Sequence, residues 1–127
     1  MVREVFEVTP TLLVVEDDVQ FVTLLWAALA DAYTLQHVST LQAALEAVGQ
    51  QLYAGILLDL HLPDSDRLST LTTMLRAVRY TPIVVLTGGA VPARQVSGCI
   101  ILHKPDIDWL TFPKLLRDFF EAPYAWR

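Results

Sequence analysis

Short, unbroken apolar runs alternate along the chain with segments of helical periodicity. Runs this short, and rich in branched residues, are typical of strands that are buried on both faces of a parallel sheet. Four runs have this character, at 11–15, 55–60, 82–87 and 99–103. A fifth strand is expected at 33–38, where "YTLQHV" alternates apolar and polar residues and therefore predicts a more exposed strand.

Helices are expected between these strands. Residues 18–30 have helical spacing, and the apolar positions that should face the core are Val19, Val22, Leu25, Trp26 and Leu29. A second helix should open at Ser39, which forms a capping-box pattern with Gln42, and should stop at Gly49.

Two further helices complete the pattern. In the helix expected at 66–79, the core positions are Leu68, Leu71, Leu75 and Val78. The last helix should start near Thr111 or Phe112, because Pro113 is tolerated only in a first turn. The repeated alternation of strand and helix predicts an α/β fold, with a parallel sheet covered by helices on both faces.

Bulk composition narrows the class of protein. With 127 residues and 54% hydrophobic residues, the chain is expected to form one domain over 1–127, with a core at about 10–121. No apolar stretch reaches about 18 residues, so no membrane span is expected.

A net charge of −5, without a Lys/Arg cluster, argues against direct nucleic acid binding. The single Cys99 excludes an internal disulfide and fits a reducing cytoplasm, where it would be a small buried strand residue.

Charged and polar side chains follow each of the four buried runs. They are Glu16, Asp17 and Asp18 after the first, Asp59 in the second, Thr87, Gly88 and Gly89 after the third, and Lys104 after the last. In open α/β sheets, ligands bind beyond the carboxyl ends of the strands, so these groups should converge. Alone, "EDD" is also typical of a helix N-terminus, and Asp59 of a turn.

The converging groups favour one chemistry. Crowded carboxylates favour a hard cation, and magnesium (Mg2+) suits a site with few carboxylates and a phosphate oxygen. Lys104 offers a compact counter-charge for a phosphoryl group, and Thr87 with its two glycines offers donors for an anion. Together they predict magnesium-assisted phosphoryl transfer onto an aspartate.

Four blocks carry a family resemblance. "LLVVEDD", "ILLDLHLPDSD", "VVLTGG" and "HKP" resemble the signature blocks of the two-component response-regulator receiver domain, in order and spacing, over roughly residues 10–121. The resemblance implies a flavodoxin-like, doubly wound sheet of five strands in the order 2-1-3-4-5.

The resemblance also implies roles for single residues. Asp59 would be the phosphoacceptor, Thr87 the switch hydroxyl and Lys104 the cation that neutralises the phosphate. The implied magnesium ligands are Glu16, Asp17, Asp59 and the backbone carbonyl of His61, with Asp17 a direct ligand and Glu16 acting through water. The side chain of His61 also flanks Asp59, where it would tune hydrolysis of the acyl phosphate. The other two histidines, His37 and His103, lack metal-ligand spacing.

The implied function is that of a cytoplasmic receiver domain with no attached output module. It would accept a phosphoryl group from a sensor histidine kinase or a phosphotransfer protein, and its phosphorylated state would be recognised by an unknown downstream protein. A homodimer is compatible with this role. The chain would not be an enzyme beyond self-catalysed phosphorylation and dephosphorylation.

Three features depart from the family pattern. Arg67 stands where glycine is usual, which would strain a left-handed backbone unless the loop adopts another turn. The segment between Thr87 and Lys104 leaves room for one or two helical turns after Pro92, so the fourth helix of the family should be shortened or missing. Ile101 replaces the usual aromatic switch residue.

Two alternatives stay open. The first, which follows from these departures, is an atypical receiver that binds partners constitutively, without a phosphorylation switch. The second is an aspartate-nucleophile phosphatase of the haloacid-dehalogenase kind, which requires a second aspartate two positions after the first, where this chain has His61. The tail with Tyr124 and Trp126 would either pack on the domain or contact a partner.

Overall fold

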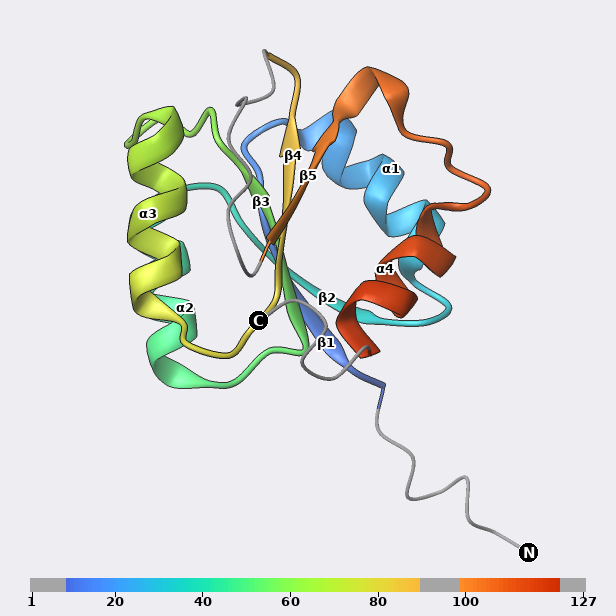
Figure 1. Cartoon of the computed structure of the whole chain (residues 1–127), viewed down its shortest axis with the longest axis horizontal. Coiled ribbons are helices and arrows are strands. Elements are labelled where there is room, and N and C mark those ends of the chain that lie inside the picture. The colour runs from blue at the N-terminus through green and yellow to red at the C-terminus, as the bar shows by residue number, and fades with distance from the viewer. Residues whose placement is uncertain (1–8, 90–98, 122–127) are drawn as a thin grey trace, which may run out of the picture.

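The computed structural model describes residues 9–89 and 99–121, which form a parallel sheet between two layers of helices (Figure 1). The strand order is β2-β1-β3-β4-β5, as predicted. In chain order the elements are β1 (Thr11–Val15), α1 (Val19–Leu29), β2 (Thr34–Val38), α2 (Leu41–Gln50), β3 (Gly55–Asp59), α3 (Arg67–Ala77), β4 (Ile83–Thr87), β5 (Cys99–His103), the 3₁₀ turn η2 (Lys104–Asp106) and α4 (Phe112–Glu121). None of the helices in these ranges has the length and apolar character that crossing a bilayer requires.

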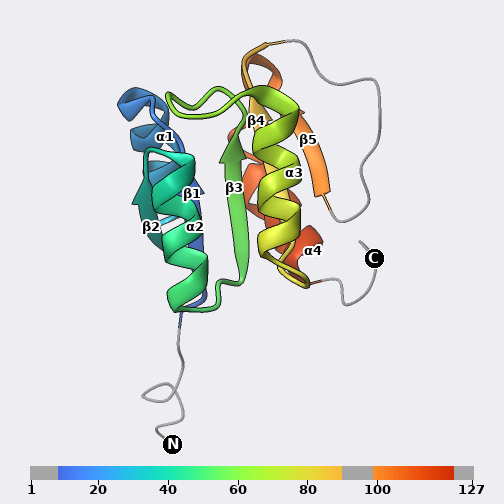
Figure 2. The same cartoon turned by 90° about the vertical axis from the view of Figure 1, so that its left-hand side faces the viewer.

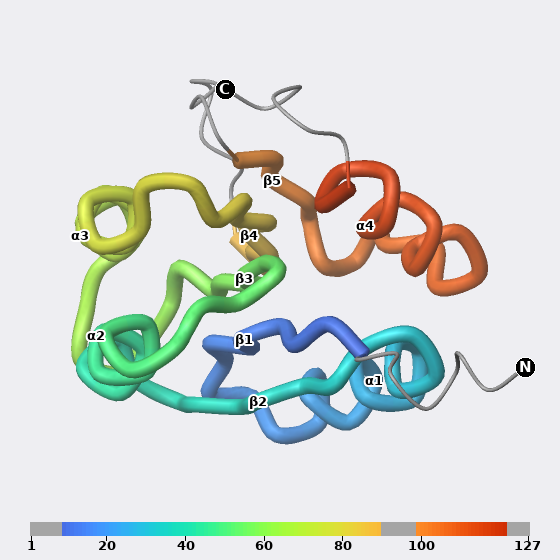
Figure 3. The backbone as a smooth tube through the Cα atoms, turned by 90° about the horizontal axis from the view of Figure 1, so that it is seen from below, coloured from blue at the N-terminus to red at the C-terminus, as the bar shows by residue number. Residues whose placement is uncertain are grey.

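The sheet separates two cores. Helices α1 and α4 cover one face, and α2 and α3 cover the other (Figures 1 and 3). In β1, Leu12 and Val14 pack toward α1 and α4, whereas Leu13 and Val15 pack toward α2 and α3. Strands β3 and β4 are likewise buried throughout, because side chains that alternate along a covered strand meet a helix layer on either side.

Strand β5 is half-buried along its whole length, so the prediction of a fully buried strand at 99–103 was wrong. Its place at the edge of the sheet explains the difference, since only β4 pairs with it among the described strands. Figure 2 shows β5 at that edge, beyond β4. Cys99 is accordingly half-buried rather than buried.

The buried face of α1 differs from the predicted one. Phe21, Val22, Leu25 and Leu29 are buried, whereas Val19 and Trp26 are 70% and 43% exposed. The helix is apolar on nearly every side, so several faces could have been buried. In the structure the buried face includes Phe21, whose ring packs against Trp109 at a centroid distance of 5.7 Å. Trp26 is therefore not a core residue.

The buried face of α3 and the start of α4 are closer to the predictions. In α3, Leu71 and Met74 are buried, but Leu68 is 57% exposed. Arg67 is the first residue of α3 and has a helical backbone, so the loop adopts another turn and no left-handed strain arises. Helix α4 begins at Phe112 as predicted. The predictions for the segment around Pro92, including the shortened or missing fourth helix, and for Tyr124 and Trp126 lie outside the described residues.

Two side chains cap the N-terminus of α2. The Thr40 hydroxyl accepts a hydrogen bond from the Ala43 N–H, so the cap is one residue beyond the predicted Ser39, and Gly49 lies inside the helix. Asp64, from the loop after β3, accepts hydrogen bonds from the N–H groups of Leu41 (2.8 Å) and Gln42 (2.9 Å). These bonds hold the pKa of Asp64 below its usual value. They also tie the β3–α3 loop to α2.

Gly55 allows α4 to pack closely on the sheet. A Cβ at this position would lie 2.5 Å from Cε1 of Phe120, too close without a shift of the ring. We expect Gly55→Ala to lower the free energy of unfolding by about 1–2 kcal/mol, measured by chemical denaturation.

Gly49→Ala is the matched control for this substitution. Gly49 is helical, and a Cβ there has no neighbour within 4 Å. Removing a helical glycine at an open position should raise stability by about 0.5–1 kcal/mol. Equal effects of the two substitutions would contradict the close packing inferred at Gly55.

Candidate functional site

The register of the sheet brings the predicted residues to one edge. Val15 pairs with Leu58, so Glu16 follows β1 level with Asp59 at the end of β3. Asp59 in turn pairs with Leu86, which places Thr87 one residue further along β4. Thr87 pairs with His103, directly before Lys104. The parallel strands therefore present these side chains together at their carboxyl ends, as the sequence predicted.

Three carboxylates form the centre of the site. Oxygen atoms of Glu16, Asp17 and Asp59 all lie within 4.8 Å of one another. Glu16 and Asp59 are 1% and 3% exposed, whereas Asp17 is exposed. Carboxylates at this separation, two of them buried, match the oxygen ligands that a hard divalent cation takes. The donor set thus fits the magnesium ion implied by the fold.

Asp18 has a different role from its two acidic neighbours. Its Oδ1 accepts hydrogen bonds from the N–H groups of Gln20 (3.0 Å) and Phe21 (3.3 Å), so it is the N-cap of α1. The helix-terminus interpretation of "EDD" therefore holds for this residue, and the cluster interpretation holds for the other two.

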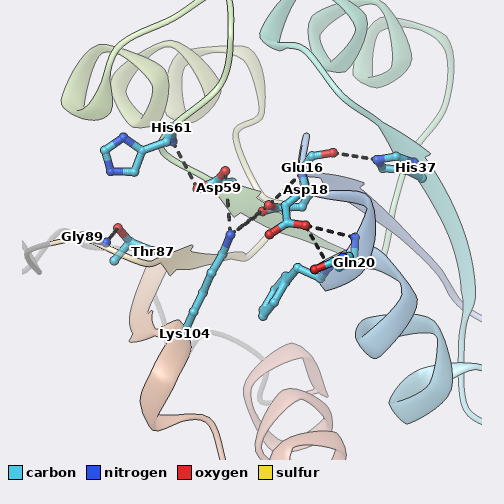
Figure 4. A network of polar contacts seen from close by, with 10 residues as sticks. Glu16, Asp18, Gln20, His37, Asp59, His61, Thr87, Gly89 and Lys104 are labelled. Atoms are coloured by element: carbon cyan, nitrogen blue, oxygen red, sulfur yellow. Dashed lines mark hydrogen bonds and ion pairs between the residues drawn. The ribbon is translucent and has the colours of Figure 1, made fainter.

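The ammonium group of Lys104 lies between the acidic residues (Figure 4). Its Nζ donates to Oε1 and Oε2 of Glu16 at 2.8 and 3.0 Å, and it lies 3.9 Å from Oδ2 of Asp59. It also lies 4.4 Å from the centre of the Phe21 ring. In this arrangement Glu16, rather than Asp59, is the closer partner of the lysine.

Burial raises the pKa values of both interior carboxyl groups. For Glu16, burial together with the negative charge of Asp59 raises the pKa to about 7, against the lowering effect of Lys104. For Asp59, burial again raises the pKa, while the hydrogen bond from the His61 N–H and the charge of Lys104 lower it. Two neighbouring buried carboxylates resist simultaneous ionisation, and a bound cation relieves that resistance.

Backbone hydrogen bonds fix the remaining side chains. The His61 N–H donates to Oδ1 of Asp59 at 3.1 Å. The Gly89 N–H donates to the Thr87 hydroxyl at 3.2 Å, and Thr87 is 1% exposed. The role of the His61 carbonyl as a metal ligand stays a prediction.

His37 contributes to the site, although the sequence did not predict it. Its Nε2–H donates to the backbone carbonyl of Glu16 at 2.6 Å, linking the end of β2 to the acidic loop (Figure 4). No sequence signal marks this contact, since the acceptor is a backbone atom 21 residues away. Only the pairing of β1 with β2 brings the two residues together.

The known proteins that resemble this chain were found by comparing structures. No protein-family model matches the sequence, and no curated protein sequence matches it. The crystal structure of a sensor protein from Polaromonas sp. JS666 matches with a TM-score of 0.74 and 29% identity, covering 89% of this chain and 97% of that one.

Two further matches are receiver domains. A response regulator receiver domain protein from Methanospirillum hungatei matches with a TM-score of 0.76 and 15% identity, over 91% of this chain and 96% of that one. The receiver domain of a sensor histidine kinase from Pseudomonas aeruginosa, with magnesium coordinated in its active-site cleft, matches with a TM-score of 0.75 and 24% identity, over 89% and 98%.

Proposed function

The chain is a receiver domain by fold, and we propose that it acts in a two-component phosphorelay with Asp59 as its phosphoacceptor. One observation carries the proposal: the Asp59 carboxylate lies in a cluster with Glu16 and Asp17 and 3.9 Å from the Lys104 ammonium. A buried carboxylate beside a cation site and a lysine is suited to attack a phosphoryl group.

The proposed step is a transfer from phosphohistidine on a sensor histidine kinase or a phosphotransfer protein. An Asp59 oxygen attacks phosphorus, the P–N bond breaks, and the electron pair of that bond remains on the imidazole. Lys104 and Thr87 supply an ammonium and a hydroxyl to the transferred group. When bound by Glu16, Asp17, Asp59 and the His61 carbonyl, Mg2+ would offset negative charge on the phosphoryl oxygens.

The acyl phosphate would shift a conformational equilibrium that a downstream protein recognises. In this proposal the domain works in the cytoplasm and catalyses nothing beyond its own phosphorylation and dephosphorylation. The magnesium described for the Pseudomonas aeruginosa neighbour supports the choice of cation.

The test is phosphorylation with acetyl phosphate. With magnesium, the chain should gain the mass of one phosphoryl group on the peptide that contains Asp59, and an excess of chelator should prevent the gain.

A folded protein that gains no mass would favour the alternative of a constitutive interaction module. That alternative is motivated by Ile101, which is aliphatic and half-buried in β5. Continuous release of phosphate from generic phosphoesters would instead support a phosphatase.

We expect Lys104→Met to increase the affinity for magnesium about tenfold at pH 8. The ammonium of Lys104 occupies both oxygens of Glu16, so a divalent cation must compete with it for that carboxylate. Methionine keeps an unbranched apolar chain over Phe21 but removes the charge. Isothermal titration calorimetry measures the dissociation constant.

Lys114→Met is the matched control, because Lys114 is exposed and pairs with Asp118 on α4. An unchanged or weaker affinity in Lys104→Met, relative to this control, would show that the lysine does not compete for the acidic cluster.

A further inference from the structure

Two polar side chains lie against Gly89. A Cβ at this position would lie 3.0 Å from Nε2 of His61 and 3.5 Å from Nη2 of Arg67. The absence of a side chain on Gly89 therefore gives the imidazole room beside the end of β4, and the guanidinium lies at an ordinary van der Waals distance from the same position. Three segments meet here: the β3–α3 loop, the first turn of α3 and the residues after β4.

Backbone hydrogen bonds link this contact to the phosphoacceptor site. The His61 N–H donates to Asp59, and the Gly89 N–H donates to the hydroxyl of Thr87. In Figure 4, His61, Thr87 and Gly89 lie on the side of Asp59 away from Glu16. Arg67, 3.5 Å from the Cβ position of Gly89, therefore approaches from the Gly89 side, whereas the Lys104 ammonium is bound to Glu16.

The guanidinium of Arg67 is available to a ligand. Arg67 is exposed, and no carboxylate of the described residues pairs with it. The other cation of the site, Lys104, is offset by Glu16 and Asp59. Three carboxylates make the site acidic, and the charge of Lys104 is already paired. Arg67 is therefore the cation that can pair with an incoming anion.

We propose that Arg67 binds the phosphoryl group of the phosphodonor as it approaches Asp59. The inference rests on the proposed function and adds a donor-binding residue to it. A guanidinium presents paired N–H donors to phosphoryl oxygens, and a positive charge beside an acidic site raises the local concentration of an anionic donor. Arg67 stays protonated throughout, while the bond from phosphorus to the leaving group breaks as the Asp59–phosphorus bond forms.

The test measures the second-order rate constant for phosphorylation by acetyl phosphate with saturating magnesium. Arg67→Gln should lower this constant about tenfold at low ionic strength, and the difference from wild type should narrow as salt is added. Arg67→Lys should be intermediate, because it keeps the charge but loses the paired donors. The control is Arg76→Gln, an exposed arginine in the last turn of α3.

Binding of beryllium trifluoride with magnesium provides an equilibrium readout of phosphoryl-group binding, and Arg67→Gln should weaken it as well. If Arg67→Gln and Arg76→Gln give the same rate constant and the same beryllofluoride affinity, the donor-binding role is wrong while Asp59 remains the phosphoacceptor. If the wild type itself takes up no phosphoryl group, the proposed function and this inference fail together.

Discussion

Asp59→Asn is expected to reduce phosphoryl uptake from acetyl phosphate by at least about a thousandfold, below detection by intact mass. The amide is nearly isosteric with the carboxylate, but it has no anionic oxygen to attack phosphorus. The matched control is Asp66→Asn, because Asp66 is an exposed aspartate directly before α3 whose side chain makes no capping hydrogen bond. This variant should be labelled like the wild type.

A thermal melt separates loss of the nucleophile from loss of the fold. Burial raises the pKa of Asp59, so removing its charge should leave the domain at least as stable as the wild type at neutral pH. A well-folded Asp59→Asn protein that is still labelled would place the phosphoacceptor at another residue and overturn the assignment.

The second large effect is a loss of stability as pH rises in the absence of divalent cations. The pKa of Glu16 rises from 4.5 to about 7 on folding, mainly because the group is buried. The folded state therefore holds the proton more tightly than the unfolded state. The resulting stabilisation is fully present below pH 4.5 and is lost as pH rises through 7, and it amounts to about 3 kcal/mol.

Urea denaturation at pH 5 and pH 8 with a chelator measures this effect. Glu16→Gln should abolish most of the pH dependence and be the more stable protein at pH 8, whereas Glu46→Gln, on the exposed side of α2, should behave like the wild type. Asp59 contributes with the same sign, because its pKa is also raised. The pKa values of Asp64 and Asp118 are lowered on folding, so these two groups make stability rise with pH. They do so in a more acidic range than the titration of Glu16. Parallel pH profiles for wild type and Glu16→Gln would contradict the raised pKa.

The strand ends were the most predictable part of the molecule. Continuous apolar runs mark the strands of a parallel sheet, and parallel strands end at one edge, so Glu16, Asp59 and Lys104 approach each other in the order β1-β3-β4-β5. Their identities alone favour a cation and a phosphoryl group as ligands.

Helix faces and contacts across long sequence separations were less accessible. When a helix is apolar on nearly every side, the spacing of its apolar residues does not show which face is buried. For this reason the predicted core positions of α1 include Trp26 and not Phe21. Asp64 caps a helix more than 20 residues earlier, and its pairing with Leu41 depends on how the β3–α3 loop folds. The approach of Arg67 to Gly89 depends on the side-chain path of an arginine, for which the sequence carries no signal.

The Lys104 ammonium lies over the Phe21 ring, and that ring packs against the Trp109 indole. We therefore expect a displacement of the lysine to be transmitted through one aromatic side chain to a natural fluorophore. The other tryptophan among the described residues, Trp26, is on the exposed side of α1 and reports mainly on solvent. Trp109 should thus serve as an optical probe of the cation that neighbours Asp59, so that its emission follows events at the site without a label.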